Sequence, residues 1–371
     1  MRSVLPWFFL AASLPVFAQQ MDSMPRPTSL DGAVPAIYPP PANPSPPAEE
    51  PEEEPNPAAA VEPAWVTTRD SLGNVRQRIK MESDFALGDR VRLGLLFGQG
   101  FLYNTLPNSS GKTEEIRDVG ITGQWHPNEV VKFEGMAGVS QAGATVDASE
   151  QPVRQAVIPI TDVQAHLTSP GKIVKVDLGF KRFIFDLSPQ LVANRAVRND
   201  FVVHPEISLS SGWRLRALAE MGPVTSAGES NARYNSEFTV GRKLGKASEL
   251  YSTYSMLHYA QPSDAGYFSP DLVQNIQGGW STDVDRKAFS LSLDFGLGAG
   301  HAKEHADTFG PWGLSLGAQS YLTWTVGGGR EVRASYEFYY DQSNPAVESS
   351  SSSSGAWHMS VLTLSFRWAT R

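Results

Sequence analysis

Two short motifs carry residue types that perform chemistry in other proteins. The stretch HAKEH places His301 and His305 four residues apart, a spacing that brings two imidazoles to one metal ion only on a helix. The stretch GLGAG, residues 296–300, resembles a phosphate-cradling loop in its glycine content. Both motifs fall in or beside a segment that alternates with a period of two, and no helical pattern follows. We therefore expect neither a metal site nor a phosphate site here.

A nucleophile and a base are also available in principle. Serine is plentiful, and His126, His166, His204 and His258 fall in expected strands or turns. No spacing among these residues defines a serine–histidine–acid triad, because such a triad is recognised by spatial geometry and not by sequence position. We expect no enzymatic activity and no cofactor, and we interpret the serine run at 349–354 as an outer loop.

The elements that hold these residues are strands. In AFSLSLDFGLGAG, residues 288–300, large apolar side chains alternate with Ser, Asp and Gly over ten positions. A period of two means that the two faces of the strand meet different surroundings. Stretches of the same pattern recur from residue 65 to the C-terminus, for example VRLGLLF, VKFEGMAGV, IVKVDLGF and VRASYEFYY. The sequence therefore predicts an all-β fold.

The N-terminal region has a different composition. Residues 1–18 combine a basic start, an apolar stretch and small residues before Gln19, which predicts a secretory signal peptide. Residues 19–63 are rich in Pro, Ala and Glu, which predicts a disordered periplasmic leader, with a binding arm for a periplasmic component as the alternative. The chain has no cysteine, so no disulfide holds the fold. Its net charge is −8 and it has no basic stripe, so we expect no nucleic-acid partner.

The connections between strands are the most informative feature. Short turns are predicted at 88–89, 127–128, 170–171, 211–212, 245–246, 283–285 and 327–329, and they alternate with longer polar loops such as 106–115, 141–151, 225–231, 301–310 and 341–355. Outer-membrane barrels have short periplasmic turns and long outer loops. Residues 64–371 are thus predicted to form a transmembrane antiparallel β-barrel of about sixteen strands in the bacterial outer membrane, with both barrel termini in the periplasm. A large soluble β protein is the alternative.

The strand faces opposite the apolar ones are predicted to line the lumen. Mixed charge signs on these faces argue against strong ion selectivity, and Tyr321 and Tyr339 are expected to stack on sugar faces. Trp125, Trp213, Trp324, Tyr340 and Trp368 lie near strand ends, as in interfacial girdles. The predicted lumen-lining residues are Arg92, Lys132, Glu134, Lys175, Asp177, Arg214, Arg216, Asp294, Tyr321, Arg333, Glu337 and Tyr339.

One stretch resembles a known family. AGYFSP, residues 265–270, follows the aromatic-rich strand LYSTYSMLHYA and precedes DLVQNIQGGW. Gly266, Tyr267, Phe268, Ser269 and Pro270 are similar to a signature of the C-terminal barrel domain of the cellulose synthase operon protein C family. Members of that family usually carry an array of tetratricopeptide repeats before the barrel, and this chain has only the Pro- and Glu-rich leader there.

The resemblance implies a sixteen-stranded outer-membrane pore that exports an exopolysaccharide, cellulose or a similar β-glucan, without a cofactor. It implies outer-membrane lipid as the surroundings, a polysaccharide chain as the translocated substrate, and a periplasmic scaffold or synthase complex as a partner. A general diffusion porin or solute channel, and a structural or adhesive surface barrel, remain alternatives because both would share the barrel.

Overall fold

The computed structural model describes residues 58–105, 113–143, 156–263, 265, 267, 269–305, 307–342 and 357–370. The predicted signal peptide, the leader up to residue 57 and the serine run at 349–354 lie outside the described residues, as do Gly266 and Phe268 of the family-like stretch.

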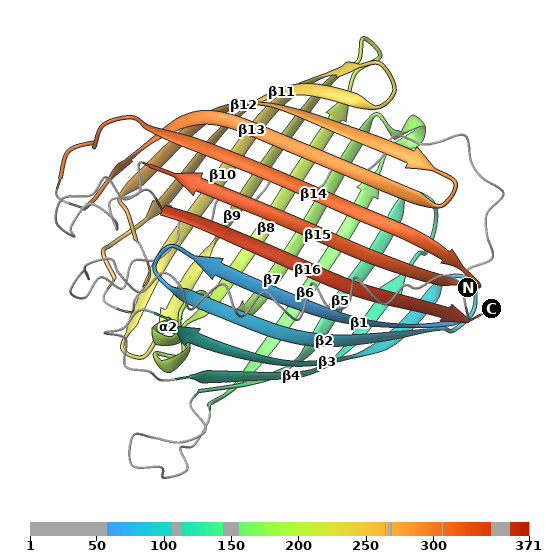
Figure 1. Ribbon diagram of the computed structural model, residues 1–371, viewed down its shortest axis with the longest axis horizontal. Coiled ribbons are helices and arrows are strands. Elements are labelled where there is room, and N and C mark those ends of the chain that lie inside the picture. Colours follow the sequence, from blue (N-terminus) through green and yellow to red (C-terminus); the bar gives the residue numbers. More distant parts are fainter. Residues whose placement is uncertain are drawn as a thin grey trace, which may run out of the picture.

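Sixteen antiparallel strands form one closed barrel (Figure 1), which confirms the predicted fold class. Each strand pairs with its neighbours in the sequence, and β1 closes the barrel on β16, with Ala59 opposite Thr370. The strands are β1 (Ala59–Asp70), β2 (Asn74–Ala86), β3 (Val91–Asn104), β4 (Glu114–Trp125), β5 (Val131–Gly143), β6 (Ala156–Thr168), β7 (Val174–Ile184), β8 (Val197–Ser208), β9 (Trp213–Ser226), β10 (Glu229–Leu244), β11 (Ser248–Tyr259), β12 (Leu272–Arg286), β13 (Phe289–Lys303), β14 (Gly313–Gly327), β15 (Arg330–Asp341) and β16 (Trp357–Thr370).

The two ends of the barrel differ. We call the end where β1 begins and β16 ends the terminal rim, and the opposite end the loop rim. The terminal rim carries the short turns, including the 3₁₀ turn η2 (Pro170–Lys172). The loop rim carries the connection that contains the short helix α2 (Pro189–Ala193). No helix in the described part of the chain is long and apolar enough to cross a membrane.

The outer surface of the barrel is apolar. Ile79, Ile121 and Val157 are more than 60% exposed, as expected for side chains that face lipid and not a protein core. Four of the predicted girdle residues, Trp125, Trp213, Trp324 and Trp368, lie near the terminal rim, and Tyr340 lies near the loop rim. The guanidinium of Arg242 stacks over Trp213, and that of Arg330 stacks over Trp368. This combination of aromatic rings and cations suits a membrane–water interface.

Two predicted connections are wrong. Residues 283–285 do not form a turn, because β12 continues through them and Asp283 pairs with Ser292 of β13; the chain turns at Lys287 and Ala288. Residues 225–231 do not form a long loop, because β9 and β10 are joined by Ala227 and Gly228 alone, with Gly228 at φ 97°. Glycine adopts this left-handed conformation at little cost, so a two-residue hairpin closes at the loop rim. The alternation of short and long connections is therefore not strict.

The predicted boundary between leader and barrel is also displaced. β1 begins at Ala59, five residues before the expected start at Ala64. Pro63 made this segment resemble the leader, because proline cannot donate a backbone hydrogen bond in a sheet. In the structure, Glu62 and Pro63 are skipped in the pairing of β1 with β16, while both still lie opposite residues of β2. The strand therefore passes the proline and continues to the terminal rim.

Candidate functional site: the plugged lumen

The connection between β7 and β8 folds into the barrel at the loop rim. We call Phe185–Ala196 the plug. Within it, the Ser188 hydroxyl accepts a hydrogen bond from the Leu191 backbone N–H at 3.3 Å, and Pro189 occupies the first turn of α2. Serine at the N-cap and proline at the first helical position both favour a helix start, which explains why a turn of helix forms here.

The plug packs against most of the barrel wall. Leu191 is fully buried with Val224, Leu257 and Val273 of β9, β11 and β12. Val192 packs with residues of β3 to β6, and Leu187 packs against Tyr339 and Trp357 of β15 and β16. A twelve-residue segment that touches walls on all these sides lies across the lumen. The plug therefore lies across the loop rim and is held there by apolar contact.

An ion pair also holds the plug to the wall. The carboxylate of Asp186 contacts Arg76 (Nη1 to Oδ1, 2.8 Å) and Arg78 (Nη1 to Oδ2, 3.4 Å), both on the lumen face of β2. Burial alone would raise the pKa of Asp186, but the charges of Arg76, Arg78 and Lys80 outweigh burial and hold this pKa below its ordinary value. Asp186 therefore ties the plug to the wall as a carboxylate at neutral pH.

A polar cavity of about 360 Å³ occupies the half of the lumen nearer the terminal rim. Among its lining residues are Lys80, Arg92, Glu134, Gln164 and Arg367. Several of its charges are paired across neighbouring strands: Arg92 with Asp84, and Lys132 with Glu134 at 2.6 Å. The cavity wall thus combines paired charges, amide groups and the ammonium of Lys80, which has no ion-pair partner within 4 Å among the described residues. Such a surface can hydrogen-bond hydroxyl groups.

A chain of polar contacts leads away from this cavity along the wall. Glu134 contacts His166 at 3.1 Å, His166 contacts Asp177 at 2.7 Å, and Asp177 contacts His204 at 3.2 Å. The chain crosses β5, β6, β7 and β8. Its side chains are partly exposed, so they line the lumen and do not form a sealed core.

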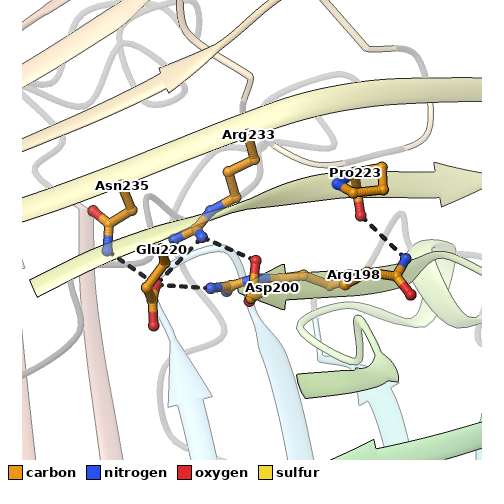
Figure 2. A network of polar contacts seen from close by, with 7 residues as sticks. Arg198, Asp200, Glu220, Pro223, Arg233 and Asn235 are labelled. Carbon is orange, nitrogen blue, oxygen red and sulfur yellow. Dashed lines mark hydrogen bonds and ion pairs between the residues drawn. The ribbon is translucent and has the colours of Figure 1, made fainter. Parts of the chain in front are cut away.

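The wall formed by β8, β9 and β10 is packed with buried charge (Figure 2). Glu220 accepts hydrogen bonds from Arg198 at 3.1 Å, from Arg233 at 3.3 Å and from Asn235 at 3.1 Å, and Asp200 contacts both arginines. The four charged side chains are at most 5% exposed. Two cations and two anions balance here, which limits the cost of removing them from water.

A second buried network lies nearer the terminal rim. Arg214 and Arg216 contact the two carboxylate oxygens of Glu249 at 3.2 and 2.9 Å. Arg214 and Arg216 are among the predicted lumen-lining residues, but both side chains are 7% exposed or less and are engaged with this carboxylate, so they are not free to bind a sugar. Their contacts with Glu249 stabilise the wall.

Tyrosines occupy the wall formed by β11 to β15. The Tyr251 hydroxyl donates to Asp294 at 2.5 Å, and the Tyr339 hydroxyl donates to Glu337 at 2.9 Å. Tyr339 is 4% exposed and packs with Trp357, so its ring has no free face for a sugar and that expectation is wrong. Tyr321 is 42% exposed and remains open to the lumen.

The other predicted lumen residues occupy separate places. Arg333 contacts Glu62 at 3.0 Å and Glu331 at 2.6 Å, and it does not pair with Glu337. Lys175 lies on β7 near the terminal rim. The twelve predicted residues thus divide between the cavity, the polar chain through Asp177, the buried network of Arg214 and Arg216, the tyrosine wall, and the separate places of Lys175 and Arg333. They do not converge on one site.

The motifs that suggested other chemistry have structural explanations. His301 stacks between Phe309 and Trp312, with ring centroids 4.3 and 4.0 Å away. No group of three or more potential metal-binding side chains occurs among the described residues. Gly298 lies within β13, where a Cβ would approach the Ile276 carbonyl oxygen to 2.0 Å. Close approach of strands therefore explains this glycine.

The family-like stretch lies beside the plug. Tyr267 is 2% exposed and packs with Phe185 of the plug and with Tyr259. Asn194 of the plug donates to the Ala265 carbonyl oxygen at 2.8 Å. The Pro270 carbonyl oxygen accepts from the Tyr259 N–H at 3.0 Å, next to the start of β12. The described residues of this stretch therefore support the plug.

The plug and its ion pair were not predicted from the sequence. A local signal was present, because Ser188 followed by Pro189 is a helix-start pattern in the middle of an otherwise strand-rich segment. Arg76, Arg78 and Lys80 also share one face of β2 by their spacing of two. No sequence signal links Asp186 to Arg76, because they are 110 positions apart.

Comparison with known proteins supports the fold. No protein-family model and no curated protein matches the chain. A solved structure described as a bacterial polysaccharide outer membrane secretin is similar, with 12% identity, a TM-score of 0.61 and coverage of 85% of this chain and 99% of that chain. OccAB1 of Acinetobacter baumannii (11% identity, TM-score 0.46, 84% and 96% coverage) and the CymD monoaromatic hydrocarbon channel (7%, 0.45, 85% and 89%) are more distant.

These identities establish the fold alone. The chain is a closed transmembrane β-barrel of the type found in outer membranes, with a plugged loop rim. The resemblance of residues 265–270 to the cellulose synthase operon protein C family finds no match at the sequence level.

Proposed function

We propose that this protein is a gated outer-membrane channel that exports an exopolysaccharide from the periplasm. The observation that supports this proposal most is the asymmetry of the lumen: a cavity of about 360 Å³ with charged and amide lining lies on the terminal side, and the plug lies across the opposite rim. With the terminal rim in the periplasm, cargo enters the cavity before it meets a closed exit. Export requires this order.

The chemistry of the cavity supports a sugar polymer as cargo. Paired charges and amides in the cavity provide hydrogen-bond partners. Outside the residues that line the cavity, the exposed ring of Tyr321 on β14 adds one aromatic face. The similar fold of a polysaccharide secretin is consistent with this cargo class. Residues 265–270 favour a cellulose-like β-glucan backbone by their resemblance to the cellulose-secretion family.

Excision of the plug tests the proposal. The Phe185 N–H donates to the Ala196 carbonyl oxygen at 2.8 Å, so the two ends of the plug already pair. An Asn-Gly dipeptide replacing residues 186–195 should close the β7–β8 hairpin with a two-residue turn. The control is Ala227→Asn, which places the same Asn-Gly pair in the β9–β10 turn and leaves the plug intact.

Single-channel conductance in planar bilayers is the measurement. We expect the wild type and the control to be mostly closed, and the excised barrel to conduct steadily and to be blocked by cellohexaose more strongly than by glucose. If neither glucose nor cellohexaose blocks the conductance of the excised barrel, the result would support a diffusion porin instead. A folded, excised barrel that stays silent would refute a channel function.

A further inference from the structure

The contact between Asp186 and β2 has the geometry of an occupied anion site. Two guanidinium groups, from Arg76 and Arg78, converge on the two oxygens of one carboxylate. The Asp186 side chain is 10% exposed, and the two arginine side chains are 23% and 19% exposed. Paired guanidinium donors are the usual means of holding a carboxylate.

Neighbouring groups hold the two arginines in place without the plug. Arg76 donates from Nη2 to the Thr68 hydroxyl at 3.2 Å. Arg78 pairs from Nη2 with Asp118, which accepts a hydrogen bond from Ser140 at 2.6 Å. These contacts leave the Nη1 atoms of both arginines directed at Asp186. The barrel wall therefore supplies a preorganised site, and the plug supplies its occupant.

A path joins this site to the cavity. Lys80 follows Arg76 and Arg78 on the same face of β2, with about 7 Å between successive members. Its ammonium lines the cavity and makes no ion pair within 4 Å in the described part of the chain. Glu82 comes next on that face. Its negative charge offsets the positive charge of Lys80, so the net charge at the cavity end of this row of cations is close to zero.

We propose that Arg76 and Arg78 bind a carboxylate of the transported sugar chain, and that Asp186 occupies their site while the channel is closed. This inference rests on the proposed export function and names its cargo as an acidic, carboxylate-bearing polysaccharide. An acidic sugar entering the cavity meets Lys80 first and then competes with Asp186 for the arginines. Loss of the Asp186 contact frees the plug from β2.

A neutral sugar does not perform this exchange. Its hydroxyl groups cannot replace the negative charge between two guanidinium groups. Five carboxylates line the cavity, and they do not form a continuous repelling surface. Asp84, Glu134 and Glu62 have cationic partners in Arg92, Lys132 and Arg333. The other two, Glu82 and Asp162, lie on separate strands, β2 and β6.

The test uses the full-length protein in planar bilayers, with oligomers added from the terminal-rim side. The probes are cellohexaose and its C6-oxidised form, which share length and backbone and differ in carboxylates. We expect the oxidised oligomer to raise the open probability of the wild type at least tenfold and cellohexaose to leave it unchanged. Lys80→Gln should require about tenfold more oxidised oligomer. Lys243→Gln, which alters a lumen lysine on β10, should respond as the wild type.

Asp186→Asn should be open without any oligomer, and the oxidised oligomer should not raise its open probability further. If this variant does not fold, Arg76→Gln removes the shorter of the two contacts to Asp186, 2.8 Å against 3.4 Å for Arg78, and should also raise the open probability without any oligomer. Equal effects of both oligomers on the wild type would overturn the carboxylate site while leaving a polysaccharide channel in place. Glucuronate as effective as the oxidised hexamer at equal carboxylate concentration would overturn the polymer as ligand. Failure of every oligomer to block the open variants would refute the export function itself.

Discussion

Substitution of Glu220 provides a stringent test of how the lumen wall is built. Glu220 neutralises Arg198 and Arg233 in a network whose four charged side chains are at most 5% exposed. Glu220→Gln keeps the size of the side chain but leaves two guanidinium groups facing one carboxylate, that of Asp200. Breaking a buried pair in this way costs about 3–5 kcal/mol, because a buried positive charge is left uncompensated.

The assay is urea unfolding from lipid vesicles, followed by fluorescence of the barrel tryptophans, from Trp65 to Trp368. We expect the free energy of unfolding to fall by about 3–5 kcal/mol in Glu220→Gln. Glu331→Gln is the matched control, since Glu331 contacts Arg333 at 2.6 Å but is 29% exposed; its cost should stay below about 1 kcal/mol.

A charge-balancing variant separates lost charge from lost packing. Adding Arg198→Gln to Glu220→Gln restores one cation, Arg233, against one anion, Asp200, and should recover at least half of the lost stability. If Glu220→Gln costs no more than Glu331→Gln, water hydrates the network and the reasoning from buried charge is refuted.

Three further predictions concern the plug and the lumen surface. Because the pKa of Asp186 is lowered, its ion pair stabilises the plug fully above the ordinary aspartate pKa of about 3.9 and is lost as the pH falls through the lowered value. Conductance should therefore stay low from neutral pH to about pH 4 and rise below it. Asp186→Asn should show no such rise. Gly279→Val should lower the free energy of unfolding by about 1–3 kcal/mol, because a Cβ there would lie 2.1 Å from the Tyr251 ring, whereas Gly278→Val, with no atom within 4 Å, should be neutral; equal urea midpoints would contradict this packing argument. In the plug-excised barrel, Tyr321→Ala should weaken block by cellohexaose about 2- to 10-fold and Leu322→Ala should not; unchanged block in Tyr321→Ala would exclude sugar stacking on this ring.

The local alternation of side chains was sufficient to predict most of the wall. A strand exposes alternate residues to its two faces, so Phe289 to Leu297 identify an apolar face without any knowledge of the partner strands. Glycine and proline at the terminal-rim turns also act locally, which is why most of those turns were predicted. The turn at 283–285 was misplaced because acidic residues resemble a turn in sequence, although here β12 carries Asp283 into the lumen, where it accepts a hydrogen bond from Ser292 at 2.7 Å.

What the sequence determined by itself is therefore the barrel: an all-β chain, sixteen strands and the opposition of an apolar face to a polar one, all encoded over a few residues at a time. Only the tertiary structure decided what fills the barrel. Closure brings Asp186 to Arg76, and it turns Tyr339 from an expected sugar platform into a buried contact of Trp357. These outcomes depend on which strands face each other across the lumen. That relation is fixed by closure of the whole sheet and not by any local pattern.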